Sequence, residues 1–337
     1  MSKRILAAAC AAATALALSA CSTTASSGGG ASKDGTLTVM ASFYPLQYLA
    51  EKVGGEHVTV TSLTPAGAEP HDLELSPKTV DALASADAVV YLAGFQAAVD
   101  EAIEQQAPTT VIDVSPVVEL VEANSSANHP SEDEDADEAQ SGESATEEHA
   151  DHDHEGHDHE GHHHDMSADP HFWLDPVRMA SAATLVGDKL AEADPANADT
   201  YKANAQALNE ELSALGDDLV AKTATCQIKT FVTAHTAFGY LADRTGLTQV
   251  GISGLDPDSS PSPARLAEIS QIAKDQGVTT IFTEALIDPK VAQTLADDLG
   301  ISTAVLDPIE SQTDSSKDYA AVMKDNINAL TTANNCQ

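Results

Sequence analysis

Apolar residues in the first third of the chain alternate between strand-like and helix-like spacing. They recur at about every second position in Thr36–Ser42 and His57–Leu63, which predicts strands, whereas Tyr44–Gly54 has the spacing of a helix. The same reading predicts, in order, a helix at Ser76–Ala86, a strand at Ala88–Leu92, a helix at Gln96–Gln106 and a strand at Thr109–Val114. This repeated alternation indicates a mainly parallel sheet with helices on both faces.

A second series of alternating strands and helices occupies the last third of the chain. The predicted elements are strands at Ile228–Ala234, Leu247–Ile252, Val278–Thr283 and Ser302–Leu306, and helices at Thr236–Thr245, Ser262–Gln276, Pro289–Leu299 and Lys317–Ala333. We therefore expect a second lobe with the same α/β architecture as the first.

Two helical stretches, Pro176–Ala193 and Asp194–Ala221, separate the two series. Asp194 and Pro195 are typical of a helix start and no further proline occurs up to Ala221, so this helix should be on the order of 40 Å long. The pattern predicts an α/β fold of two lobes joined by a long rigid helix, with the ligand site in the cleft between them. Because a continuous helix resists bending, we expect only limited motion of the lobes.

The alternation is interrupted at 124–166 by a segment with almost no apolar residues. It contains the motif HDHEG twice in succession, with a five-residue period that matches neither a helix nor a strand. Its eight clustered histidines are His149, His152, His154, His157, His159, His162, His163 and His164. Such a segment cannot bury a core, so it is predicted to be a disordered acidic loop.

The N-terminus is typical of an export signal. Lys3 and Arg4 precede an apolar stretch that is too short to span a bilayer, and the sequence LSAC ending at Cys21 resembles a bacterial lipobox. We expect Cys21 to be lipidated and the Ser/Thr/Gly-rich residues after it to form a flexible tether. A plain secretory signal with an incidental cysteine is the alternative.

These patterns divide the chain into seven parts. We predict a signal peptide (1–20), a lipidated tether (21–35), an N-terminal lobe (36–123), the His-rich loop (124–166), the end of the N-terminal lobe (167–193), a linking helix (194–222) and a C-terminal lobe (223–337).

The net charge of the 337-residue chain is −37, from 16 basic and 53 acidic residues. This balance excludes a nucleic-acid partner, since phosphates require Lys/Arg-rich surfaces, but it is compatible with a cationic ligand. Much of the excess is local, because residues 129–165 hold fifteen acidic residues and no basic one.

Only two cysteines remain once the signal is removed and Cys21 is lipidated. Cys226 and Cys336 should form a disulfide outside the cytoplasm, where thiols usually pair, and this bond would fix the C-terminal helix. Zinc thiolates are the alternative, but such ligands usually occur as closely spaced pairs.

Three histidines lie at predicted element boundaries rather than in the loop. His71 follows a strand, His171 precedes the two central helices, and His235 lies where a strand gives way to a helix. Each alone is most often a surface or capping residue. Together they indicate a metal site, because three imidazoles and one oxygen complete a tetrahedral shell around zinc.

The segments around these histidines, GAEPHDLELSP, ADPHFWLDP and AHTAFGYL, resemble the metal-binding solute-binding proteins of bacterial zinc and manganese ABC importers. The resemblance extends from about Thr36 to the C-terminus, without the loop. It implies two α/β lobes bridged by a rigid helix, with the metal between them and His71, His171 and His235 as ligands.

The resemblance also implies a carboxylate as fourth ligand near the end of a late strand. Asp307, in TAVLDPIE, fits this position best. Glu284 also lies at a late strand end, and we interpret it as a residue that holds a ligand or a loop, with direct ligation as the alternative. Some zinc-specific relatives have Glu directly before the first His, where this chain has Pro70. The nearest acidic residue there is Glu69, to which we assign only a supporting role.

Three histidines and one carboxylate favour Zn²⁺ over Mn²⁺, which prefers harder oxygen ligands. The His-rich loop favours zinc as well. Since a flexible chain loses entropy when it closes around an ion, the loop should bind zinc more weakly than a preformed pocket. We expect it to concentrate or sense zinc near the cleft, and a solvated acidic linker is the alternative.

These expectations point to an extracytoplasmic, lipid-anchored or periplasmic receptor that captures Zn²⁺ for the permease of an ABC importer. We expect a monomer. An enzyme is disfavoured, because a filled ligand shell leaves no open coordination position and neither HExxH nor GxSxG occurs outside the His-rich loop. The alternatives are a manganese receptor of the same family and a surface adhesin or zinc buffer. The pair Phe172-Trp173 is predicted to pack the lobes.

Overall fold

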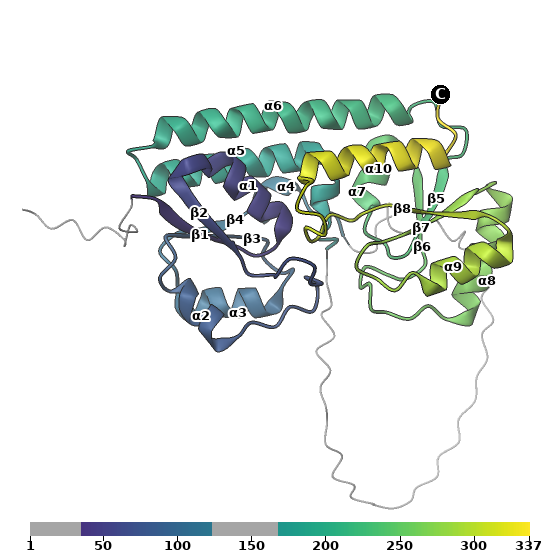
Figure 1. Ribbon diagram of the computed structural model, residues 1–337, viewed down its shortest axis with the longest axis horizontal. Coiled ribbons are helices and arrows are strands. Elements are labelled where there is room, and N and C mark those ends of the chain that lie inside the picture. The colour runs from purple at the N-terminus through teal and green to yellow at the C-terminus, as the bar shows by residue number, and fades with distance from the viewer. Residues whose placement is uncertain (1–34, 123–167) are drawn as a thin grey trace, which may run out of the picture.

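The computed structural model describes residues 35–122 and 168–337 (Figure 1). The predicted signal peptide, lipidated Cys21 and His-rich loop with its eight histidines lie outside these residues. Within the described part, no helix is long and apolar enough to cross a membrane.

The N-terminal lobe is built on a four-stranded parallel sheet in the order β2-β1-β3-β4. The strands are β1 (Leu37–Ala41), β2 (Val58–Ser62), β3 (Ala88–Tyr91) and β4 (Val111–Asp113), and the helices are α1 (Tyr44–Gly54), α2 (Pro77–Leu83), α3 (Ala97–Gln106) and the short α4 (Ser115–Val118), with a 3₁₀ turn η1 (Gly55–His57). Helices α2 and α3 pack on one face of the sheet and α1 on the other. As predicted, Ser76 caps α2, because its side chain accepts a hydrogen bond from the Thr79 amide.

The C-terminal lobe repeats this topology with the strand order β6-β5-β7-β8, again all parallel. Its strands are β5 (Thr230–Thr233), β6 (Thr248–Gly251), β7 (Thr280–Thr283) and β8 (Ser302–Val305), and its helices are α7 (Gly239–Thr245), α8 (Pro263–Asp275), α9 (Lys290–Leu299) and α10 (Tyr319–Ala333). Helices α8 and α9 cover one face, while α7 and α10 lie on the other (Figure 1).

Two antiparallel helices connect the lobes after the 3₁₀ turn η2 (Phe172–Leu174). They are α5 (Pro176–Ala193) and α6 (Ala198–Thr223), and α6 runs along both lobes, packing on α1 and α5 at one end and on α7 and α10 at the other (Figure 1). With 26 residues, α6 is about 39 Å long. The predicted two-lobe α/β fold with a long connecting helix is therefore confirmed.

The predicted start of the long helix at Asp194 is wrong. Asp194 terminates α5, and its carboxylate accepts hydrogen bonds from the Ala196 amide and the Asn197 side chain, which form a tight turn. The helix therefore begins four residues later, at Ala198. Asp and Asn side chains favour such turns because they bond to nearby backbone and side-chain donors.

The other predicted packing features are present. Cys226 and Cys336 form the expected disulfide, which ties the end of α10 to the segment after α6. Trp173 is fully buried among Phe43, Phe95 and His171, and its indole nitrogen donates to the Pro308 carbonyl of the other lobe. This residue therefore packs the two lobes together, as expected.

Candidate metal centre

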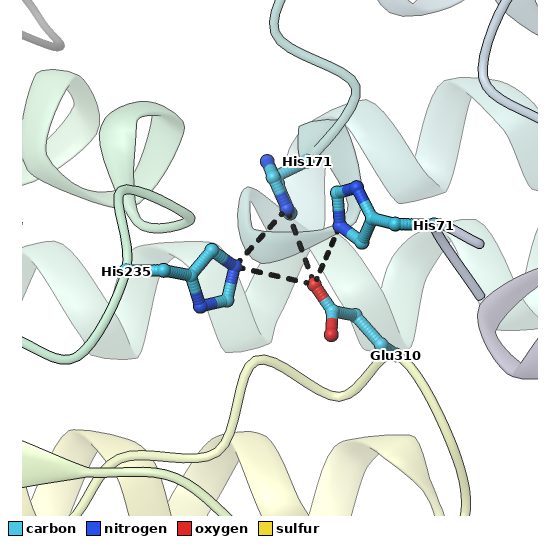
Figure 2. A group of neighbouring side chains, drawn as sticks. All are labelled: His71, His171, His235 and Glu310. Atoms are coloured by element: carbon cyan, nitrogen blue, oxygen red, sulfur yellow. Dashed lines mark hydrogen bonds and ion pairs between the residues drawn. The ribbon is translucent and has the colours of Figure 1, made fainter. Parts of the chain in front are cut away.

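Four side chains from separate segments converge between the lobes: His71, His171, His235 and Glu310 (Figure 2). One ligand atom from each lies within 4.8 Å of all the others. The three imidazoles direct Nε2 at a single carboxylate oxygen, Glu310 Oε1, which lies 3.1 Å from His171, 3.4 Å from His71 and 3.4 Å from His235. His171, His235 and Glu310 are almost fully buried, and the His71 side chain is 6% exposed.

The fold brings these residues together at the ends of its strands. His71 lies in the loop after β2, and His235 lies two residues after β5. His171 directly precedes η2, and Glu310 lies in the turn that follows β8. Carboxyl ends of parallel strands meet at one edge of a sheet, and here the edges of both sheets face the same cleft.

Neighbouring carboxylates fix the orientation of two of the rings. Glu284 accepts from the His235 backbone amide at 3.0 Å and lies 2.6 Å from its Nδ1. Asp169 does the same for His171, at 3.0 Å from the amide and 2.8 Å from Nδ1. Because a carboxylate holds Nδ1 as the protonated nitrogen, Nε2 is left free to coordinate a metal.

His71 is held differently. Its backbone amide donates to Glu69 at 3.1 Å, and its ring packs edge-on against Phe95. The Gln96 side chain fixes the loop from behind by donating to the Pro70 carbonyl at 3.0 Å. Glu69 and Glu284 thus each accept a hydrogen bond from a backbone amide of the group, and their supporting roles in metal binding stay predictions.

Burial and charge shift the pKa values of the four residues in different directions. Burial would raise the pKa of Glu310, but hydrogen bonds from the three histidines hold it well below its usual range. For His235, burial is outweighed by the charge and hydrogen bond of Glu284, so its pKa lies well above 6.5. The pKa of His171 is raised too, since bonds to Asp169 and Glu310 outweigh its burial, whereas burial lowers that of His71. Without a metal, these shifts favour protonated His171 and His235 beside an ionised Glu310.

The structure does not bring Asp307 into this group, where the sequence analysis had placed the fourth ligand. The Asp307 carboxylate accepts from the Ile309 amide at 2.8 Å instead, and burial raises its pKa. Glu310, three residues further along the same motif, occupies the position expected for Asp307. The acidic residue at the end of this motif was the available signal, but the sequence did not show that the chain turns back after Leu306.

A cavity of about 250 Å³ lies beside the four residues, at the carboxyl ends of β5, β6 and β7. Its lining includes Glu69, Ala234, Ser253 and Asp258. Burial and the charge of Glu310 raise the pKa of Glu69 to about 7. Ala234 directly precedes His235, so this cavity lies next to the group in the C-terminal lobe, although none of the four residues lines it.

Three neutral imidazoles and one carboxylate form a donor set of the kind that zinc accepts in tetrahedral sites. Zinc tolerates several nitrogen ligands, whereas manganese and magnesium favour oxygen. Four protein donors would complete a four-coordinate shell and leave no position for a reacting water. The arrangement is therefore suited to holding a metal ion and not to catalysis by it.

Comparison with protein families gives a match over residues 39–333 to the model described as zinc-uptake complex component A, periplasmic. Among curated proteins, the zinc-binding protein AdcA of Streptococcus pyogenes is 33% identical over 312 residues, which cover 88% of this chain and 56% of that protein. The high-affinity zinc uptake system protein ZnuA of Bacillus subtilis is 33% identical over 307 residues, covering 89% and 88%. The chain thus spans little more than half the length of the AdcA relatives.

Solved structures share the fold as well. The Zn(II)-bound ZnuA-like domain of Streptococcus pneumoniae AdcA matches with a TM-score of 0.68 and 29% identity, over 89% of this chain and 99% of that one. The laminin-binding protein Lmb of Streptococcus agalactiae, described as bifunctional with adhesin and metal-transporting activity, gives a TM-score of 0.72 and 29% identity, over 88% and 99%.

Proposed function

Because the chain belongs to the family of periplasmic A components of zinc-uptake complexes, we propose that it is an extracytoplasmic receptor with high affinity for Zn²⁺. The observation that carries this proposal is the convergence of three imidazole nitrogens on one buried carboxylate oxygen between two lobes. The family consists of solute-binding receptors rather than enzymes, which agrees with a donor set that fills the shell of the ion.

In this proposal, His71, His171, His235 and Glu310 bind the ion directly. Zn²⁺ takes the place of the protons that the histidines carry and lies among the four donor atoms. Glu284 and Asp169 hold the Nδ1 atoms of His235 and His171 and so keep both rings in the orientation that binding needs.

The bound ion would then be delivered to the permease of an ABC importer. A lipid on Cys21 would keep the receptor at the outer face of the membrane, within reach of that permease. The proteins with similar sequences include one named zinc-binding lipoprotein AdcA, of Streptococcus pneumoniae, and this name supports such an anchor. The His-rich loop would serve as a weaker accessory site that raises the local zinc concentration, with the histidines at 149–164 as its ligands.

A competitive zinc titration tests the central claim. The mature chain and a variant lacking 129–165 should each retain one tight site, whereas His71→Ala/His171→Ala/His235→Ala should retain only weak ones. His57→Ala is the matched control, because this histidine contacts Tyr201 far from the group and should not affect tight binding. Tight binding by the triple variant together with its loss on loop deletion would show that the two sites had been assigned the wrong way round.

Adhesion is the second candidate, supported by the likeness to a protein described as both adhesin and metal transporter. An adhesin surface should bind laminin even when the metal ligands are replaced, whereas transport requires them. Binding of immobilised laminin by the triple variant, compared with the unaltered chain, separates the two activities. A manganese receptor is the third candidate, and titration with Mn²⁺ in the same assay tests it.

A further inference from the structure

The turn that carries Glu310 has an unfavourable backbone. Ile309, the preceding residue, has a φ of 57°, in the left-handed region that β-branched residues rarely adopt. Its side chain is 1% exposed, so it cannot easily move to relieve this conformation. A residue in such a conformation persists only when its surroundings hold it there, and such residues concentrate at binding sites.

One buried side chain holds the base of this turn from the neighbouring helix. Asn326, in the middle of α10, is 3% exposed and pairs with both backbone groups of Asp307. Its Oδ1 accepts from the Asp307 amide at 2.8 Å, and its Nδ2 donates to the Asp307 carbonyl at 2.6 Å. This two-point contact fixes both the position and the direction of the chain as it leaves Leu306.

From Asp307 the constraint passes along the turn. The Asp307 carboxylate accepts from the Ile309 amide at 2.8 Å, and the Trp173 indole donates to the Pro308 carbonyl at 2.7 Å. The three consecutive residues before Glu310 thus each have a backbone group bonded to a side chain. Asn326 bonds to Asp307, Trp173 bonds to Pro308, and Asp307 in turn bonds to Ile309.

We propose that Asn326 is the positioning residue for Glu310: it holds Asp307 so that the unfavourable turn at Ile309 directs the carboxylate at the three histidines. This inference rests on the proposed zinc-binding function and assigns the residue that sets its affinity from outside the ligand group. Among the hydrogen bonds and ion pairs of the described residues, none joins Asn326 to the four ligands, so it acts through the backbone of the turn.

Replacement of Asn326 by alanine would remove the side-chain amide that pairs with Asp307. The backbone N–H and C=O of Asp307 would then lose these partners in a partly buried place. The turn could then relax toward a more favourable φ at Ile309 and carry Glu310 away from the three Nε2 atoms. Loss of groups that orient metal ligands typically lowers metal affinity by about 10- to 100-fold. We expect Asn326→Ala to fall in this range.

A matched control lies at the C-terminal cap of the same helix. Asn334 is 1% exposed, and its side chain also donates to a backbone carbonyl, that of Ile228 at 2.9 Å, but it lies at the far end of α10 from Glu310. Asn334→Ala should lower the thermal stability of the metal-free chain, as any loss of a buried hydrogen bond does, and leave zinc affinity unchanged.

The test measures three quantities on the mature chain: zinc affinity by chelator competition, the visible spectrum of the Co²⁺ complex, and the unfolding temperature without metal. Asn326→Ala should lower zinc affinity about 10- to 100-fold and alter the Co²⁺ bands, because the carboxylate leaves the tetrahedral set. Asn326→Asp, which keeps the acceptor for the Asp307 amide and loses the donor, should show a smaller change and keeps the test valid if the alanine variant does not fold.

A double-mutant cycle with Glu310→Gln distinguishes positioning from general stability. If Asn326 acts through Glu310, Asn326→Ala should cost much less zinc affinity in the Glu310→Gln background than in the unaltered chain. Equal costs in both backgrounds, or an unchanged Co²⁺ spectrum while the unaltered chain binds zinc tightly, would overturn this inference alone. Failure of the unaltered chain to bind zinc would overturn the proposed function, and this inference with it.

Discussion

At the scale of single residues, the site depends on one carboxylate oxygen that three imidazoles share. Glu310 Oε1 is within 3.4 Å of all three Nε2 atoms, and the residue is 1% exposed. A buried charge of this kind needs compensation, which protons on the histidines supply in the metal-free chain and Zn²⁺ supplies in the bound one. Binding is therefore an exchange of protons for a metal ion.

This exchange predicts that zinc affinity rises with pH. The pKa values of His171 and His235 are raised, so these rings keep their protons to higher pH than an ordinary histidine, and zinc must displace those protons. Competition titrations at pH 6, 7 and 8 should show affinity increasing throughout, with protons released as the ion binds. An affinity independent of pH above 6.5 would contradict this prediction.

The stability of the metal-free chain should depend on pH in the opposite sense. A raised histidine pKa contributes stability that is complete below the ordinary value of 6.5 and is lost as pH rises through the raised value. The lowered pKa of Glu310 contributes stability above the ordinary 4.5 that is lost only as pH falls through the lowered value. Glu310, His171 and His235 thus together stabilise the metal-free chain most between 4.5 and 6.5, while the lowered pKa of His71 acts in the opposite direction below 6.5. The zinc-induced rise in unfolding temperature should grow from pH 6.5 to 8.

Glu284 gives a third prediction at this scale. Glu284→Gln removes the charge that holds Nδ1 of His235 at 2.6 Å and weakens the ring as a ligand. We expect zinc affinity to fall by about 10- to 100-fold. Glu268→Gln, on the exposed surface of α8 beside Arg265, is the control and should leave affinity unchanged. Equal affinities for the two variants would show that Glu284 has no role in binding.

At the scale of elements, the sequence was sufficient for most of the fold. Short runs with alternating or continuous apolar residues predicted all eight strands to within about two residues, including the edge strand β8, which has no buried residue. Ser76 was recognised as a helix cap, since its pairing with the following proline is a local signal. The start of α6 was misplaced, because Asp194 bonds to residues of a turn that periodicity does not detect.

The same limit explains the error at the fourth ligand position. The three histidines could be found because each lies at a boundary between elements, where side chains face the cleft. Asp307 and Glu310 are both acidic residues after the same strand, and their roles depend on the left-handed conformation of Ile309 and on contacts with Asn326 and Trp173. Those contacts come from elements distant in sequence, so no local pattern could rank the two residues.

One contact between elements predicts how fast the ion leaves. The Gly67 amide, in the loop that carries His71, donates to the Ser311 hydroxyl at 2.7 Å, directly after Glu310. This bond joins the loop of His71 to the C-terminal lobe, and His71 is the most exposed of the four candidate ligands. Ser311→Ala should therefore raise the zinc dissociation rate about 2- to 10-fold, as expected for the loss of one hydrogen bond. Stopped-flow mixing with a chelator measures the rate.

The control for this experiment is Ser316→Ala. Ser316 is an exposed serine in the same segment, and its hydroxyl bonds only to Asp314 among the contacts of the described residues. If both variants release zinc as slowly as the unaltered chain, the contact between Gly67 and Ser311 does not restrain the His71 loop.

At the scale of the whole molecule, the packing of α6 limits how far the lobes can separate. One end of this continuous helix packs on α1 and α5, and the other packs on α7 and α10 (Figure 1). Trp173 adds a buried contact between the lobes through its bond to Pro308, and the disulfide ties the end of α10 to the segment after α6. Opening by a hinge would have to bend α6 or break these contacts.

We therefore expect zinc release to proceed by small loop movements around His71 and Glu310 and not by separation of the lobes. Small-angle X-ray scattering of the variant lacking 129–165 removes the contribution of the His-rich segment and compares the metal-free and zinc-bound forms. The radius of gyration should change by about 1 Å or less, the scale of backbone movement in preorganised binding sites. A change of several ångströms would mean that α6 does not restrain the lobes, and delivery to a permease would then have to involve opening of the whole cleft.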